Sequence, residues 1–285
     1  MRSIKKLSAA ITLLALSMVV GVTSVRGDLV IAPTVAAYDY DFTTGALSTS
    51  YATITFSTVN NMPQIVFSDP KPPDPANGAT FFGVAKPVHF CDSSGVCDTV
   101  VFTQSACTGA QTGGGPPGCN EAAGTLTFGD FVMYTAKGDT LNQITNLATR
   151  YYIPSPDSCG VGSPRFTLPM SDGKNIFVYI GPVPSFVGCT PNTWSNPDSG
   201  TNYATDTAGN RWDVSQLTSS NPTLCPGSYT VYTVAVACAN SLGLTISATF
   251  LSTDGGGSAT AAPPPTQTQT VYFQSIQVNG VTRFP

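Results

Sequence analysis

Hydrophobic and polar residues alternate along several short segments of the chain. In residues 52–57 the apolar side chains fall on one side and the hydroxyl side chains on the other, and residues 245–250 repeat the pattern. A period of two is typical of a β-strand with one buried face. The continuous apolar run at residues 176–180 instead predicts a strand buried on both faces. Residues 270–278 predict the last strand, followed by an Asn-Gly turn at residues 279–280.

Turn-forming residues separate these segments. Stretches rich in Pro or Gly at residues 70–75, 113–118 and 255–265 predict long loops. In residues 125–133 the alternation changes phase at Gly129, and a glycine β-bulge would account for the change. Many short strands without a regular helical pattern favour an all-β fold. We therefore predict a two-sheet, jelly-roll-like β-sandwich with long loops and at most one or two short helices.

The start of the chain has the pattern of an export signal. Arg2, Lys5 and Lys6 precede an apolar stretch at residues 7–22, which is the order found in secretory signal peptides. Cleavage of residues 1–27 would leave 28–285, in which no linker separates two domains, so we expect a single β-sandwich domain. Two alternatives are an uncleaved membrane anchor and a pilin-type leader retained for assembly. After cleavage we expect no membrane segment.

The charge balance argues against nucleic acid as a partner. The chain has 12 basic and 16 acidic residues, for a net charge of −4. Four of the basic residues lie in the leader, so the mature chain would have 8 basic and 16 acidic residues, a net charge of −8. An acidic surface repels nucleic acid and anionic lipid.

Eight cysteines, an even number, stand in a chain predicted to be exported. Disulfides are the usual interpretation in that context. A zinc site is the alternative, but the chain has no C-x-x-C pair and one histidine. The spacing favours pairs of sequence neighbours, which are Cys91–Cys97, Cys107–Cys119, Cys159–Cys189 and Cys225–Cys238.

The C-terminal half resembles a group of secreted bacterial proteins, common in actinobacteria, for which no activity is established. The resemblance is carried by Cys-Gly-Val-Gly-Ser-Pro-Arg-Phe at residues 159–166, close to a C-G-x-G-S-P-R-F string, and by residues 175–181, 211–217 and 270–280. It implies export and a β fold. Residues 229–240 fit a strand or a short helix, and the resemblance favours the helix.

The end of the chain also resembles carbohydrate-binding jelly-roll modules. The last strand of such modules often contains Asp-Asn, where this chain has Gln274-Ser275. That difference puts in doubt the structural calcium site that these modules often build near their termini.

Aromatic and polar residues gather in one late region. Flat rings stack on sugar faces, and Asp or Asn side chains bind hydroxyl groups. The ligand-binding candidates are Trp194, Tyr203, Trp212, Asp206 and Asn210. The alternative is that the tryptophans fill the end of the core. The oxygens of Asp198, Asp206 and Asp213 are weaker candidates for Ca²⁺ ligands, and no other cofactor is expected.

Residues that could support catalysis are few. The single histidine, His89, lies beside Cys91 and is expected to be structural or at the surface, and no G-x-S-x-G motif is present. Glu121, the only glutamate, is expected in a solvated loop. Arg165 could contact a ligand or could pair with an Asp or with loop carbonyls. We therefore expect a protein that is not an enzyme.

Three functions remain open. The leading hypothesis is a non-catalytic module that is secreted or held at the cell surface and binds a polysaccharide or another surface component. The alternative is a structural subunit of an extracellular filament, sheath or surface layer, in which residues 29–35 would insert as a strand into a neighbouring copy. An unusual hydrolase is the third.

Overall fold

The computed structural model describes most of the chain from residue 128 onward and several strands before it. The described residues are 37–41, 46–49, 53–59, 62–68, 78–83, 85–92, 95, 98–104, 128–160, 162–195, 202–206, 209–254 and 269–284, and before Ala85 only the backbone is described. The predicted leader, residues 29–35, Cys107, Cys119, Glu121 and Asp198 lie outside these ranges.

The larger of two sheets has eight antiparallel strands. Its order is β12 (Trp212–Asp213), β11 (Asn175–Tyr179), β10 (Arg165–Pro169), β13 (Thr249–Asp254), β8 (Phe128–Met133), β5 (Gly78–Gly83), β1 (Ala37–Asp41) and β2 (Ala46–Thr49). The expected apolar strand is β11, in which residues 176–179 are all buried. A separate hairpin pairs β3 (Thr53–Val59) with β4 (Met62–Ser68).

The smaller sheet has five strands and is built around β14 (Gln269–Val278). Along one edge β14 pairs with β9 (Leu147–Tyr152); along the other it pairs first with β7 (Asp98–Gln104) and then with β15 (Val281–Phe284). The outermost strand is β6 (Ala85–His89), which pairs with β7. The Asn279-Gly280 turn joins β14 to β15, and both residues have the positive φ angles, 53° and 73°, that such a turn requires.

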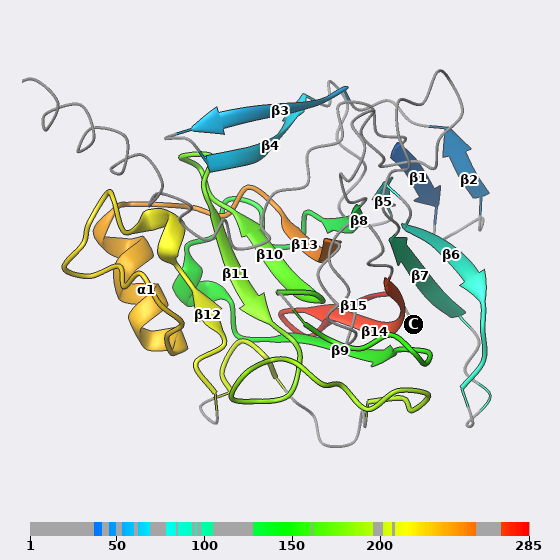
Figure 1. Cartoon of the computed structure of the whole chain (residues 1–285). Helices are drawn as coiled ribbons and strands as arrows, with labels where there is room; N and C mark the ends of the chain where they lie inside the picture. The colour runs from blue at the N-terminus through cyan, green and yellow to red at the C-terminus, as the bar shows by residue number, and fades with distance from the viewer. Residues whose placement is uncertain are drawn as a thin grey trace, which may run out of the picture.

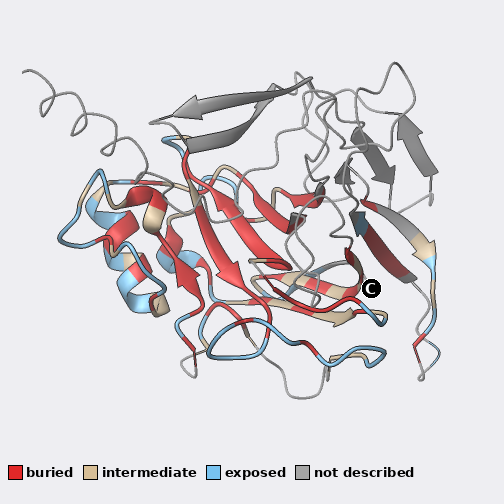
Figure 2. Cartoon of the chain, viewed as in Figure 1, coloured by how far each residue is buried: buried red, intermediate tan, exposed pale blue. Residues whose placement is uncertain are grey.

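The two sheets enclose one hydrophobic core, seen as the buried strands in the centre of Figure 2. Phe131, Phe166 and Leu251 from the larger sheet and Phe102 and Phe273 from the smaller sheet belong to it, and all are 0% exposed. Burial of such side chains stabilises the fold by about 1.5–3 kcal/mol each. The prediction of a two-sheet β-sandwich is therefore confirmed.

Residues 229–240 contain the helix α1 (Tyr232–Ser241), shown at the side of β12 in Figure 1. Its buried residues, Ala235, Cys238 and Ala239, recur at helical spacing. The helix ends in a Schellman motif, because the N–H groups of Gly243 and Leu244 donate to the carbonyls of Asn240 and Ala239. Gly243 has a φ of +64°, which favours glycine. The helical alternative is thus confirmed.

Two single 3-10 turns, η1 (Leu141–Gln143) and η2 (Ser215–Leu217), complete the described helices.

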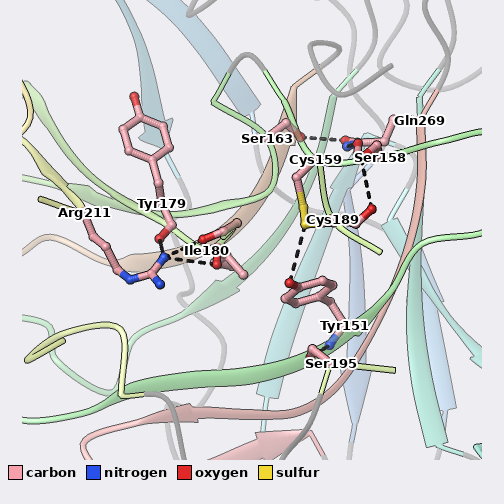
Figure 3. The surroundings of a disulfide bond; sticks show 11 residues. Tyr151, Ser158, Cys159, Ser163, Tyr179, Ile180, Cys189, Ser195, Arg211 and Gln269 are labelled. Atoms are coloured by element: carbon pink, nitrogen blue, oxygen red, sulfur yellow. Dashed lines mark hydrogen bonds between the residues drawn. A yellow bond between two sulfur atoms is a disulfide. The ribbon is translucent and has the colours of Figure 1, made fainter. Parts of the chain in front are cut away.

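Two of the four predicted disulfides are confirmed. Cys159–Cys189, the centre of Figure 3, has a Cα–Cα distance of 5.0 Å, and Cys225–Cys238, which ties α1 to the preceding loop, has one of 4.9 Å. Cys91 is also disulfide-bonded, but Cys97 lies outside the described residues, so this pairing and Cys107–Cys119 stay predictions. Disulfides indicate an oxidising compartment. None of the described helices is long and apolar enough to cross a membrane.

The predicted bulge at Gly129 is wrong. Gly129 pairs in regular register with Gly83 on one side and Thr253 on the other. A Cβ atom at Gly129 would lie 3.4 Å from the side chain of Phe102 in the facing sheet, so glycine fits the close approach of the two sheets. The register does shift in β14, at Ser275, whose φ is 50°.

Candidate functional site

The structure separates the two predicted ligand-binding tryptophans. Trp212 is 0% exposed, its indole N–H donates to the Ala204 carbonyl at 3.0 Å, and its ring packs 5.2 Å from that of Tyr232. Tyr203 is 5% exposed, and burial raises the pKa of its hydroxyl. Neither ring can present a face to a ligand. As ligand contacts both are corrected, because both belong to the hydrophobic core. For Trp212 this was the alternative interpretation.

Asp206 serves in a buried ion pair. Its carboxylate accepts a hydrogen bond from Arg211 Nε at 2.5 Å. The Nη1 atom of the same guanidinium donates to the carbonyls of Tyr179, Ile180 and Gly181 at 3.0, 3.2 and 2.7 Å, as Figure 3 shows for the first two. Arg211 thus holds the chain after β11 in place. Asp206 is a structural counter-ion, and Asn210, exposed nearby, is the one candidate of this stretch that faces solvent.

Two of the three proposed calcium ligands, Asp206 and Asp213, are already bonded within the protein. Asp213 is 2% exposed, and its two oxygens accept hydrogen bonds from the Tyr179 hydroxyl at 3.1 Å and the Ser215 N–H at 2.9 Å. Asp206 pairs with Arg211, and Asp198 is not described. In the described ranges no three His, Cys, Asp or Glu residues are grouped so that they could hold a metal ion.

Trp194 lies in a cluster of four rings, which we call the aromatic patch: Phe90, Tyr152, Trp194 and Tyr272. Ring centroids are 4.2 Å apart for Phe90 and Tyr272, 5.3 Å for Phe90 and Tyr152, and 5.6 Å for Tyr152 and Trp194. All four residues are half-buried. Each ring therefore packs against its neighbours and still meets solvent.

The smaller sheet positions the aromatic patch on its outer face. Tyr152 of β9 and Tyr272 of β14 are direct cross-strand partners. Side chains alternate between the faces of a strand, and Val271 and Phe273 both point into the core, so Tyr272 points outward. Phe90 follows the end of β6, and Trp194 forms an isolated β-bridge with Tyr152. Four segments far apart in the sequence thus supply one ring each.

A buried ion pair supports the aromatic patch from one side. Arg150, two residues before Tyr152 on the same face of β9, forms a salt bridge with Asp92 and a 3.2 Å hydrogen bond with the side-chain oxygen of Gln274. The Asp92 side chain is 0% exposed and that of Arg150 13%. The Arg150 guanidinium lies 5.2 Å from the Trp194 ring centroid, at cation–π distance. The ion pair therefore fixes the orientation of Trp194.

Polar atoms are available around the rings. Within the described part of the chain, neither the Trp194 indole N–H nor the Tyr272 hydroxyl forms a hydrogen bond with another residue. Asn192 is exposed; its side-chain oxygen accepts a hydrogen bond from the Ser155 N–H at 2.9 Å and lies 3.5 Å from the Tyr152 hydroxyl. A half-exposed apolar surface bordered by such groups is suited to binding a small polar ring.

Reasoning from the sequence found one member of the aromatic patch and missed the other three. A signal for Tyr272 was present: it stands at an outward position of an alternating strand, where a polar residue is usual. Nothing local distinguishes Phe90 or Tyr152, because their roles depend on pairing across the sheet.

Of the residues considered for catalysis, the structure describes His89 and Arg165. His89 is exposed, with its Nε2 atom 3.6 Å from Cys91 Sγ, and Glu121 is not described. Arg165 is 5% exposed, donates to the Gly162 carbonyl at 3.0 Å, and lies 4.5 Å from the Phe177 ring centroid. Its predicted bonding to a loop carbonyl is confirmed.

A second polar group, Asp130, Ser252 and Arg165, lies on the outer face of the larger sheet. These residues are in register on β8, β13 and β10 and are 4–5% exposed. Burial raises the pKa of Asp130 from 3.8 to about 6, although the Ser252 hydrogen bond and the Arg165 charge oppose the increase. The protonated form of Asp130 is therefore favoured by folding.

This pKa predicts a pH dependence of stability. A folded pKa above the unfolded value contributes stability that is complete below about pH 4 and lost as the pH rises through about 6. A difference of about two units corresponds to about 3 kcal/mol. In urea unfolding, the free energy of unfolding of wild type should fall by about that much relative to that of Asp130→Asn between about pH 4 and pH 7. A difference between the two proteins that does not change with pH would contradict the assignment.

Comparison of the chain with family models, with curated proteins and with solved structures finds no match in any of the three. The functional interpretation therefore depends on the geometry of the aromatic patch.

Proposed function

We propose that this protein is an exported, non-catalytic binding module and that the aromatic patch binds carbohydrate. The observation that supports it is the packing of four half-exposed rings, Phe90, Tyr152, Trp194 and Tyr272, on the outer face of the smaller sheet. The C–H groups of a sugar ring pack against aromatic faces, while its hydroxyls need nearby hydrogen-bonding groups such as the Tyr272 hydroxyl and the Asn192 amide.

Nucleic acid is the other common ligand of exposed rings. Single-stranded nucleic acid binds where aromatic stacking is combined with a positively charged groove. Here the chain has a net charge of −4, and the arginine beside the rings is already paired with Asp92. The charges therefore favour a sugar over a polyanion.

The leader-like pattern of the first 27 residues and the disulfides support the proposed location. Disulfides persist in oxidising compartments outside the cytoplasm. A secreted or surface-exposed protein would meet polysaccharides directly, so the proposed location and the proposed ligand agree.

A polysaccharide pull-down with the mature protein tests the proposal. Trp194→Ala should weaken binding about tenfold or more, because removing a central ring typically costs over 1 kcal/mol. Tyr229→Ala is the matched control, since Tyr229 is an exposed ring outside the aromatic patch that packs against Tyr179 and Phe186. Equal binding by wild type and Trp194→Ala, or equal losses in both variants, would contradict the proposal.

A further inference from the structure

Resting on the proposed function, we infer that the aromatic patch recognises a neutral sugar, one or two residues at a time, and neither an acidic polysaccharide nor the flat surface of an insoluble polymer. Two independent features of the patch support this: the balance of its charges and the angles between its rings.

The charge beside the rings is balanced within the protein. Among the described side chains, Arg150 is the cation in contact with the aromatic patch, and its guanidinium is bound by the buried Asp92 carboxylate and by Gln274. A carboxylate on a ligand would have to compete with Asp92 for the same guanidinium. Since the side chain of Arg150 is 13% exposed, the arginine acts as a positioning residue for Trp194.

The charge of the whole chain acts in the same direction. A net charge of −4, or −8 without the leader, repels an acidic polymer at long range. The polar groups at the border of the aromatic patch, the Tyr272 hydroxyl, the Trp194 N–H and the Asn192 amide, are uncharged. They match the hydroxyl groups of a neutral sugar.

The angles between the rings limit the size of the ligand. Phe90 and Tyr272 are inclined by 26°, Tyr152 and Trp194 by 47°, and Tyr152 and Tyr272 by 73°. The four rings pack on one another and do not form a row of coplanar faces. One face of Trp194 is also covered by Arg150. A compact apolar surface of this kind accommodates one or two sugar rings at a chain end or branch.

The test compares ligands of different charge and form. Mature wild type is titrated with soluble neutral polymers (xylan, mannan and β-glucan) and with acidic polygalacturonate and hyaluronan, each at low and high salt, about 0.02 M and about 0.5 M. We expect binding of a neutral polymer with a Kd that changes less than about twofold with salt, because no charge is screened. Crystalline cellulose should retain no more of the wild-type protein than of the Trp194→Ala variant.

Three results would overturn the inference while leaving sugar binding intact. They are a preference for an acidic polymer, a Kd that rises about tenfold in high salt, and Trp194-dependent adsorption to crystalline cellulose. Binding of no polymer, or binding that Trp194→Ala does not weaken, would overturn the proposed function itself.

Discussion

Trp212→Ala should lower the free energy of unfolding by about 3–5 kcal/mol, the range for removing a buried aromatic side chain. Trp212 is 0% exposed and packs between β12 and α1, 5.2 Å from the Tyr232 ring. The substitution leaves a cavity and an Ala204 carbonyl without its donor. Since small domains are stable by only about 5–15 kcal/mol, the loss would be evident in urea or thermal unfolding.

The matched control is Trp194→Ala. Trp194 is half-buried and lies at the outer face of the smaller sheet, so its removal should cost less than about 1.5 kcal/mol. The two variants remove the same side chain from the same late region of the sequence. Equal destabilisation by both would show that Trp194 is part of the core and would contradict its assignment to a binding surface.

Arg211→Met should be comparably destabilising, by about 3–5 kcal/mol, because breaking a buried ion pair leaves an uncompensated charge. Arg211 is 5% exposed and binds Asp206 and three consecutive carbonyls, the last of β11 and the two that follow it. Methionine fills a similar volume and can satisfy none of these acceptors. Denaturant unfolding with an unchanged m-value would show that the loss is one of stability.

Two further variants test the cause of that loss. Arg211→Lys should recover little, since an ammonium group cannot reproduce the planar donor fork. Asp206→Asn should cost less than Arg211→Met, because the three carbonyls keep their donor. If Arg211→Met costs less than about 1 kcal/mol, the guanidinium does not hold the chain as described.

Much of the fold could be predicted because its signals are local. Residues 176–180 are apolar without interruption, and residues 176–179 lie in β11, a strand buried on both faces. Cys159 and Cys189, and likewise Cys225 and Cys238, are neighbouring cysteines in the sequence, and they pair. The helix could not be predicted from the residues of 229–240 alone, since its buried positions are mostly small residues. The resemblance to a group of secreted bacterial proteins favoured the helix.

The aromatic patch could not be predicted because it depends on long-range pairing. Trp194 and Trp212 both flank a polar stretch in the sequence. The packing of the sheets places Trp212 in the core and leaves Trp194 partly exposed to solvent. Tyr152 and Tyr272 come together only because β9 pairs with β14. The β-bulge was wrongly predicted at Gly129 for the same reason. Glycine is needed there because the side chain of Phe102 in the facing sheet lies close to it, and no local pattern reveals that contact.

Tryptophan fluorescence tests the binding surface most directly, because the chain has two tryptophans and one of them is fully buried. In wild type, acrylamide should quench an accessible fraction of the emission, that of Trp194, and a bound neutral oligosaccharide should protect it. Trp194→Phe should lack both the accessible fraction and the response to the sugar. Quenching that a bound sugar leaves unchanged would show that the ligand binds elsewhere and would contradict a carbohydrate site at the aromatic patch.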